Sequence, residues 1–249
     1  MIKLVILLSI CSCVLSLRYP KVEVRIAGGL PGNISDYPWQ ISLQHSGKHT
    51  CGGSIFNDKI IVTAAHCFKN DDVSKLQIRA GSSYWDKGGV VVKVAAFRSH
   101  KDYDPDVVNN DIAVIRLKSP LPLGSNIKPI PLTTNEPGDG TSAVVTGWGI
   151  LKEGNSSLPS QLQYVNLNIV DRKTCSAAYE DFIIDSNTIC AAADDKDACP
   201  GDSGGPLVAD GSLVGVVSFG LGCADPNYPG VYVNVFKLRE WITENAKKV

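Results

Sequence analysis

Short runs of alternating apolar and polar residues recur along the chain, and turn residues separate them. After Pro38, the run from Trp39 to Gln44 alternates strictly, which places every second side chain on one face of a strand. The same kind of pattern predicts strands over 53–63 (two strands around a turn), 90–96, 112–117, 143–145, 163–170, 213–219 and 230–236. The body of the chain is therefore predicted to be all-β.

One amphipathic helix is predicted, near the C-terminal end. Leu238, Trp241, Ile242 and Asn245 follow the i, i+3, i+4, i+7 spacing and form a narrow stripe that favours packing on the body. Many short strands that end in a single helix are typical of barrels or a sandwich, and not of βαβ units.

Composition agrees with a globular chain and excludes some function classes. Of 249 residues, 44% are hydrophobic and 20% charged, which is enough apolar surface for a core. The formal net charge is −1 and there is no basic block, so we expect no nucleic-acid partner. Beyond the N-terminus there is no run of about 18 apolar residues, so we expect no membrane span.

The N-terminus has the order of a secretory signal peptide. Met1-Ile2-Lys3 is basic, 4–15 is apolar, and Ser16 is a small residue suited to cleavage. We therefore expect a signal peptide over 1–16 and a secreted, extracellular protein. Six of the eight cysteines then remain, and an oxidising compartment favours three disulfides. Pairs that lie close in sequence are Cys51 and Cys67, Cys175 and Cys190, and Cys199 and Cys223, but spacing alone leaves the pairing open.

Three short segments carry residues suited to nucleophilic catalysis. His66 stands among small residues beside Cys67, although a lone histidine is more often structural. Asp111 opens an apolar strand, where a carboxylate needs partners, or it is simply a turn acid. Ser203 lies between glycines, where backbone N–H groups can face an oxyanion, or the segment is an ordinary loop. Their occurrence together in one secreted, disulfide-bonded chain favours catalysis.

The segments TAAHC, DIAV and GDSGGP resemble the His, Asp and Ser motifs of the chymotrypsin-like serine proteases, in that family's chain order. The resemblance extends from Ile26 to the C-terminus. It implies an all-β fold of two antiparallel six-stranded β-barrels, with the active site between them and a C-terminal helix. It also implies the disulfides Cys51–Cys67, Cys175–Cys190 and Cys199–Cys223.

The segment 201–205 also satisfies the G-x-S-x-G pattern of the α/β-hydrolases. That fold needs the order Ser, acid, His and a helix after the nucleophile. Here the order is His66, Asp111, Ser203, and Pro206 follows three residues after the serine, which argues against a helix there. The sequence therefore excludes the esterase interpretation.

By resemblance, the reaction is peptide hydrolysis through a Ser-His-Asp acyl-enzyme mechanism, with no metal and no organic cofactor. Ser203 is the implied nucleophile, His66 the base and Asp111 the residue that orients it. The N–H groups of Gly201 and Ser203 are the implied oxyanion hole, and Ser218 matches the family position that helps to hold the catalytic Asp.

Substrate preference is implied by Asp197, six residues before the nucleophile. In the trypsin-like branch, an Asp at this place lies at the base of the primary pocket and pairs with Arg or Lys. Gly220 and Gly230 match wall positions that leave room for a long side chain, and with Ser218 they are the implied substrate-binding set. Phe219 stands where most relatives have Trp.

Activation is implied by Arg25, which precedes Ile26 at a junction like that of the family's zymogens. Residues 17–25 would be the activation peptide and 26–249 the protease domain. The new ammonium group of Ile26 is expected to pair with Asp202, beside the nucleophile.

Expected partners are protein or peptide substrates with Arg or Lys, and protein protease inhibitors. No nucleic-acid or membrane partner is expected, and the protein is expected to be a monomer. A digestive, secretory-granule or venom role is favoured. The alternatives are a limited-proteolysis cascade and a catalytically idle binding homologue, which would usually lack one of His66, Asp111 and Ser203. Asn33 and Asn155 stand in glycosylation sequons whose use the sequence leaves open.

Overall fold

The computed structural model describes residues 29–68, 72–151, 157–179, 182–193, 198–199, 201–223 and 225–249. The strands are β1 (Leu30–Pro31), β2 (Gln40–His45), β3 (Lys48–Ile55), β4 (Ile60–Thr63), β5 (Leu76–Ala80), β6 (Val90–Ser99), β7 (Ala113–Leu117), β8 (Ser142–Gly147), β9 (Gln163–Val170), β10 (Thr188–Ala192), β11 (Pro206–Ala209), β12 (Ser212–Phe219) and β13 (Gly230–Asn234). The α-helices are α1 (Arg172–Ala178) and α2 (Val235–Lys248), and short 3-10 helices cover Ala65–Cys67 and Val73–Lys75. The predicted signal peptide and activation peptide, Ile26, Asn155 and Asp197 lie outside the described residues.

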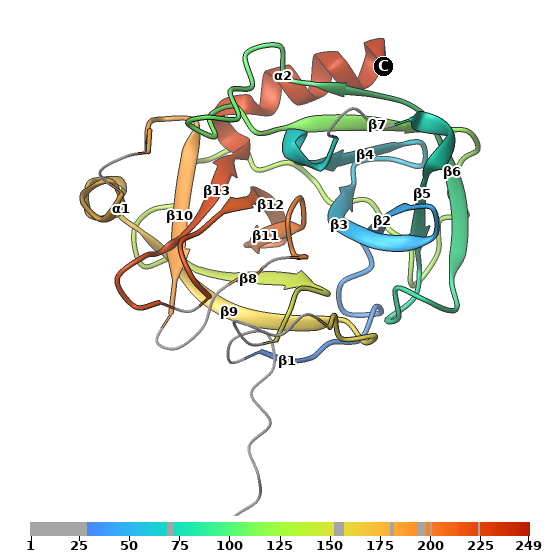
Figure 1. The fold of residues 1–249 in the computed structure, drawn as a ribbon, viewed down its shortest axis with the longest axis horizontal. Coiled ribbons are helices and arrows are strands. Elements are labelled where there is room, and N and C mark those ends of the chain that lie inside the picture. Colours follow the sequence, from blue (N-terminus) through green and yellow to red (C-terminus); the bar gives the residue numbers. More distant parts are fainter. Residues whose placement is uncertain are drawn as a thin grey trace, which may run out of the picture.

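The strands form two closed antiparallel barrels, as the resemblance implied. The first barrel has the order β2-β3-β4-β7-β6-β5 and closes through the pairing of β2 with β5. The second has the order β9-β10-β13-β12-β11-β8 and closes through the pairing of β8 with β9, while β1 adds to β9 from outside. Figure 1 shows the first barrel on the right, the second on the left and α2 across the top. The prediction of two six-stranded barrels is confirmed.

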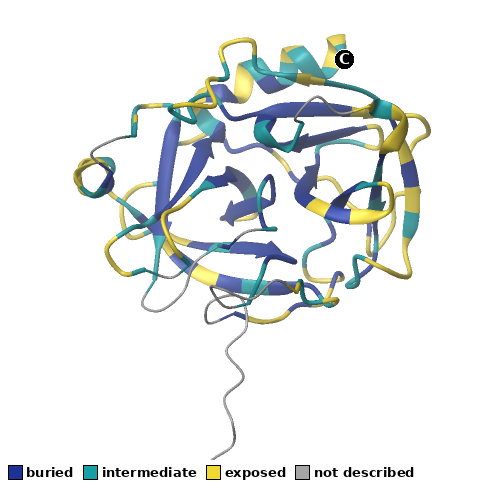
Figure 2. Cartoon of the chain, in the orientation of Figure 1, coloured by how far each residue is buried: buried dark blue, intermediate teal, exposed yellow. Residues whose placement is uncertain are grey.

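Three apolar clusters hold this arrangement. One fills the first barrel, around Ile41 and Ile78, and one fills the second, around Val165 and Tyr232. The third lies between the barrels and beneath α2. Its members include Ile60, Val62, Val114, Leu213, Val216, Leu238 and Ile242. Figure 2 shows the buried strands at the centre and exposed loops at the rim. The third cluster fixes the two barrels against each other, because both contribute side chains to it.

Some element boundaries differ from the sequence pattern. The strand predicted over 230–236 ends at Asn234, whose side chain caps α2 by accepting from the N–H of Lys237 at 3.4 Å. Helix α1 was not predicted. Asp171 caps it and Cys175 is its one buried residue, so it has no apolar stripe to reveal it. Strands β1, β5, β10 and β11 were not predicted either. β1 has only two residues, and β10 and β11 are buried on both faces and do not alternate, whereas β5 does alternate, so its pattern was present in the sequence.

Two of the implied disulfides are present. Cys51 is bonded to Cys67, and Cys175 is bonded to Cys190. Cys199 and Cys223 lie on the wall of one pocket, and their pairing stays a prediction. Among the described residues, no helix is both long enough and apolar enough to cross a membrane.

Candidate active site

His66 and Asp111 lie next to each other at one edge of the first barrel. Thr63 at the end of β4 pairs with Ala113 at the start of β7, so the chain just after β4 and just before β7 lies at one edge of the barrel. His66 Nδ1 lies 2.7 Å from Asp111 Oδ2, and the backbone N–H of His66 donates to Asp111 Oδ1 at 2.8 Å. The His66 side chain is 22% exposed and that of Asp111 is 0% exposed. The buried carboxylate of Asp111 therefore binds one side of the imidazole, while another part of the ring faces solvent.

The second barrel supplies a further donor to the same carboxylate. Ser218 Oγ, in β12, donates to Asp111 Oδ2 at 2.6 Å. An ionised carboxylate only accepts hydrogen bonds, so it favours the tautomer of His66 with a proton on Nδ1. Nε2 is then left to accept a proton.

The turn that carries Ser203 makes backbone hydrogen bonds with both barrels. The N–H of Gly52 in β3 donates to the carbonyl of Ser203 at 2.8 Å, and the N–H of Gly204 donates to Val217 O at 2.8 Å. Gly204 has φ +76°, and a Cβ there would collide with Thr63 Oγ1. Only glycine satisfies both constraints, which explains the residue directly after the serine.

Gly201 is held by a buried histidine that the sequence analysis did not single out. His49 Nε2 lies 2.9 Å from the carbonyl oxygen of Gly201, and its Nδ1 lies 2.8 Å from Ser42 Oγ. Burial lowers the pKa of His49 to about 4, and the hydrogen bond to Gly201 opposes that shift. His49 is thus neutral at neutral pH, and Nε2 carries the proton because a carbonyl only accepts. The signal available in the sequence was that His49 stands two residues before Cys51, on the same face of a strand.

Asp202 is buried directly beside Ser203. Its Oδ1 accepts from the N–H of Gly149 at 2.8 Å and its Oδ2 from the N–H of Cys199 at 2.9 Å. Burial raises the pKa of Asp202 to about 6, and these two hydrogen bonds oppose the shift. A carboxylate in this place gains strongly from a cation.

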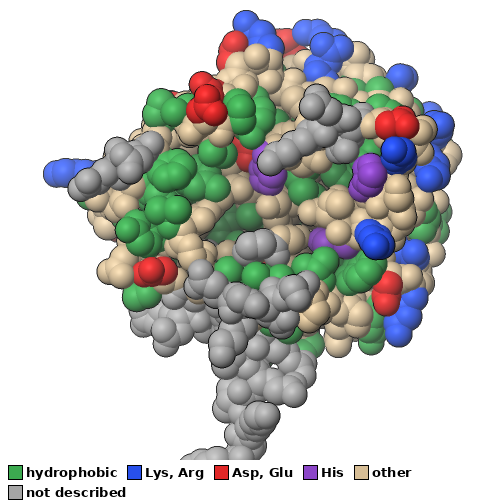
Figure 3. Space-filling view, viewed as in Figure 1, with side chains coloured by type: hydrophobic (Ala, Val, Ile, Leu, Met, Phe, Trp, Pro, Cys, Tyr) green, Lys and Arg blue, Asp and Glu red, His purple; other side chains and the backbone are tan. Residues whose placement is uncertain are grey.

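A pocket of about 430 Å³ opens beside Ser203. Its lining residues are Ile150, Ala198, Cys199, Ser203, Val217, Ser218, Phe219, Gly220, Gly222, Cys223, Gly230, Val231 and Tyr232. The structure thus brings Ser203 together with Ser218, Gly220 and Gly230. Asp197 directly precedes Ala198 in the sequence. Figure 3 shows this face of the molecule, with histidine side chains near the junction of the barrels.

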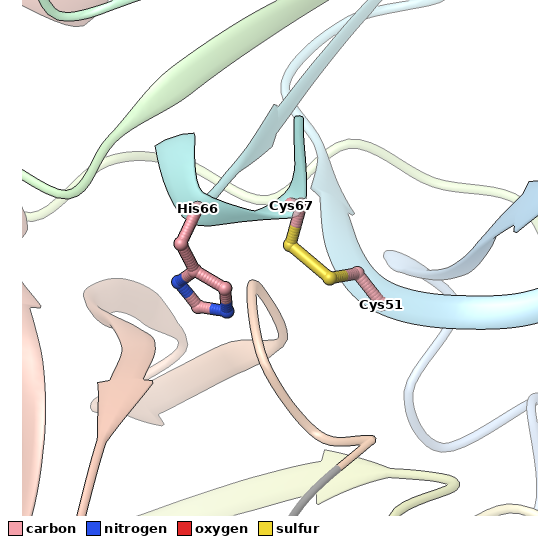
Figure 4. Close-up of side chains that lie close together, drawn as sticks. All are labelled: Cys51, His66 and Cys67. Atoms are coloured by element: carbon pink, nitrogen blue, oxygen red, sulfur yellow. A yellow bond between two sulfur atoms is a disulfide. The ribbon is translucent and has the colours of Figure 1, made fainter. Parts of the chain in front are cut away.

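A disulfide lies next to the candidate base. Cys51, His66 and Cys67 place nitrogen and sulfur atoms within 4.8 Å of one another, which is a spacing that metal ligands can have. The two sulfurs are bonded to each other, however, as Figure 4 shows, and a disulfide offers no thiolate to a metal. The disulfide instead ties the segment that carries His66 to β3.

Comparisons with known proteins agree with this geometry. The Trypsin family model matches residues 26–242. Trypsin beta of Drosophila erecta is 54% identical over 253 residues, which cover 99% of this chain and all of the relative. Trypsin alpha of Drosophila melanogaster is 53% identical over 256 residues and the full length of both. The solved structure of neuropsin, a serine protease expressed in the limbic system of mouse brain, has a TM-score of 0.82 at 31% identity, over 87% of this chain and 98% of neuropsin. The chain belongs to the trypsin family and is a trypsin-like serine endopeptidase.

Proposed function

We propose that this chain is made as a secreted zymogen whose mature form, residues 26–249, cleaves peptide bonds after Arg or Lys. In this proposal Ser203 is the nucleophile, His66 the base and Asp111 the orienting carboxylate. The observation that carries it is the pair of hydrogen bonds that Asp111 Oδ2 accepts from His66 and Ser218, beside a pocket lined by Ser203. Proteins of this family are typically secreted and made as zymogens, which supports the first part.

The chemistry follows from the orientation of His66. Ser203 Oγ attacks the carbonyl carbon of the scissile bond, and its proton passes to His66 Nε2. Asp111 stabilises the imidazolium that results, because it accepts the Nδ1 hydrogen bond. The imidazolium then protonates the leaving amine, and the C–N bond breaks to give an acyl-enzyme. Water then attacks the acyl carbon while the same histidine takes a proton from it. The bond between the acyl carbon and Ser203 Oγ breaks as the histidine returns that proton to Ser203, which releases the acid.

The proposed oxyanion hole uses the N–H groups of Gly201 and Ser203. Gly201 has φ +103°, which favours glycine and turns its peptide out of the ordinary strand direction. The bond from His49 to the carbonyl of Gly201 supports this arrangement. Loss of one oxyanion donor in related chemistry costs ~10²–10³ in rate.

The primary pocket is proposed to bind the Arg or Lys side chain. Val217 and Val231 line the pocket and can pack against the methylene stem, and Gly220 and Gly230 add no side chain there. Asp197 would meet the cation at the inner end, and a buried pair of this kind depends on both charges. Family membership also implies protein substrates and protein protease inhibitors as partners. We propose that the enzyme acts as a monomer.

Activation is proposed to follow cleavage after Arg25. The new α-amino group of Ile26 would pair with Asp202, which is buried and has its pKa raised by that burial. Because Asp202 directly precedes Ser203, the ion pair would fix the turn that carries Gly201 and the nucleophile.

The test is hydrolysis of chromogenic peptides that end in Arg, Lys, Phe or Leu, after trypsin treatment of the precursor and removal of the trypsin. Hydrolysis confined to Arg and Lys, and abolished by Ser203→Ala in a chain of unchanged fold, is the expected result. Activity of Ser203→Ala near that of the wild type would refute the assignment. Digestion of whole proteins then separates a digestive role, with many cleavages, from a cascade role with few.

A further inference from the structure

Four polar side chains tie the segment before Asp111 to the second barrel. Asn109 Nδ2 donates to Asp185 Oδ2 at 2.9 Å, and Asn187 Nδ2 donates to Asn110 Oδ1 at 3.0 Å. Asn109 and Asn110 belong to the chain between β6 and β7 of the first barrel, while Asp185 and Asn187 form the turn before β10 of the second. We call these four residues the inter-barrel clamp.

On the first-barrel side, side-chain hydrogen bonds add to the backbone ones, in which the carbonyls of Asn109 and Asn110 accept from the N–H groups of Asp104 and Ile112. Asn110 has φ +53°, a region that Asn adopts more readily than most residues. Its N–H donates to Asn109 Oδ1 at 2.7 Å, and its Nδ2 donates to the carbonyl of Asp102 at 3.1 Å. Val108 also has φ +51°, a strained conformation for a β-branched residue that surrounding contacts must hold. The clamp therefore adds side-chain contacts with the second barrel to the local hydrogen bonds of the segment that precedes Asp111.

On the second-barrel side, the turn is itself well anchored. The N–H of Asn187 donates to Asp185 Oδ1 at 2.8 Å, and the carbonyl of Asn187 accepts from the N–H of Asn234 at 2.8 Å. Asn234 ends β13 and caps α2, and its Nδ2 donates to the carbonyl of Ser186 at 3.1 Å. Asn187 is thus a rigid point of the second barrel to which the first-barrel segment is attached.

Asp111 needs such a reference point because it serves both barrels. It accepts from His66 of the first barrel at 2.7 Å and from Ser218 of the second at 2.6 Å. We propose that Asn110 and Asn187 are positioning residues that set Asp111 against Ser218 and so orient His66. This inference rests on the proposed function of Asp111. It predicts that loss of the clamp weakens the His66–Asp111 hydrogen bond without touching the substrate.

The test uses the activated full chain with Asn187→Ala, Asn110→Gly and the double variant. Glycine at 110 keeps the positive φ accessible, so that backbone strain does not confuse the result. We expect kcat to fall about 10-fold in each single variant, less than the ~10² that a misplacement of 1 Å can cost, while KM stays within about 2-fold. The double variant should be no slower than Asn110→Gly, because Asn110→Gly already lacks the hydrogen bond between Asn187 and Asn110 as well as the bond to Asp102.

Two readouts separate positioning from general stability. The acid limb of the kcat/KM profile should move to lower pH, because the imidazolium loses part of its carboxylate partner. The downfield proton resonance of His66 Nδ1–H, measured in a Ser203→Ala background, should move upfield or broaden. Asn57→Ala is the control, since the Asn57 side chain accepts from Lys59 and Ile60 in its own turn.

Variants that unfold more easily but keep the wild-type kcat, acid limb and Nδ1–H resonance would overturn the proposal. Additive losses in the double variant would overturn it as well. Failure of the proposed function is a different result, because an activated wild-type chain would then give no burst with a serine-directed active-site titrant.

Discussion

Asp202 is a buried carboxylate whose pKa differs between the folded and the unfolded chain. Burial raises its pKa from 3.8 to about 6. A folded-state pKa above the unfolded value means that the folded chain binds the extra proton between these values. Its contribution to the free energy of unfolding is therefore complete below pH 3.8 and is lost as the pH rises through about 6. At neutral pH, this carboxylate opposes folding until a cation joins it.

Replacement of Asp202 by Asn should remove this pH dependence from the precursor. In a chain kept uncleaved by Arg25→Gln, urea unfolding is measured at pH 4 and pH 7 for the parent and for the Asn variant. At each pH, the free energy of unfolding of the parent is subtracted from that of the Asn variant. This difference should be about 2–3 kcal/mol more favourable to the variant at pH 7 than at pH 4. Any pH-independent effect of the new amide on the free energy of unfolding is the same at both pH values and therefore cancels. Asp58→Asn at an exposed turn is the control, and a pH-independent difference for Asp202→Asn would contradict the prediction.

Asp197 should decide the preference for a basic residue. Asp197→Ser leaves a substrate cation buried without a partner, at a cost of about 3–5 kcal/mol, or roughly 10²–10⁴ in kcat/KM for Arg and Lys peptides. Asp195→Ser, two residues away in the same acidic run, removes an equal charge and is expected to change kcat/KM by less than about 2-fold. Equal losses of kcat/KM from both substitutions would show that the total charge of the acidic run matters, and not the position of Asp197 in the pocket.

The residues of the site differ in how far the sequence could reveal them. His66, Asp111 and Ser203 stand in short motifs whose joint occurrence is specific, so they were predicted. His49 was missed because its contact with Gly201 joins residues 152 positions apart, and nothing near either residue indicates the other. The same holds for Asn110 and Asn187, which are 77 positions apart. Motifs thus predict candidate reacting groups, whereas the groups that contact these candidates depend on tertiary structure.

At the scale of the element, helix α1 should depend on its disulfide. Cys175 is its one buried residue and is bonded to Cys190 in β10, 15 positions on. Removal of both sulfurs by Cys175→Ala and Cys190→Ala should cost about 3 kcal/mol by the chain-entropy estimate for a loop of this length. Hydrogen exchange should show this loss in the amides that exchange by global unfolding, and a larger loss of protection in 172–178. The same loss in 172–178 as in both barrels would mean that the disulfide stabilises the whole chain and not the helix in particular.

Elements with a strict pattern were predictable, and elements defined by distant partners were not. The predicted strand over 163–170 agrees with β9 because its inward residues, such as Val165 and Leu167, alternate with more exposed ones. The closure of the first barrel pairs Ile41 with Ala80, across a stretch that contains two other strands. No local pattern encodes such a register. The two-barrel architecture therefore came from the family resemblance and not from alternation.

At the scale of the whole molecule, the candidate site is shared between the two barrels. The first barrel supplies His66 and Asp111, and the second supplies Ser203 and Ser218. The apolar cluster between the barrels fixes their mutual position, so formation of the site does not require the barrels to move. We therefore predict that activation is a local step, at the turn that contains Gly201, Asp202 and Ser203.

Cleavage after Arg25 should therefore switch on an enzyme whose barrels are already assembled. The wild-type precursor and Arg25→Gln are treated with trypsin, which is then removed, and hydrolysis of an Arg peptide is measured. The wild type should gain at least about 10² in kcat/KM, the scale of one oxyanion donor, while Arg25→Gln should gain none. A chain prepared to begin at Ile26 should be active without trypsin, which controls for damage by the treatment. Asp202→Asn in that mature chain should lose most of the gain, because the new ammonium group has no carboxylate to meet. Full activity of uncleaved Arg25→Gln, or normal turnover of mature Asp202→Asn, would show that the turn forms without the ion pair.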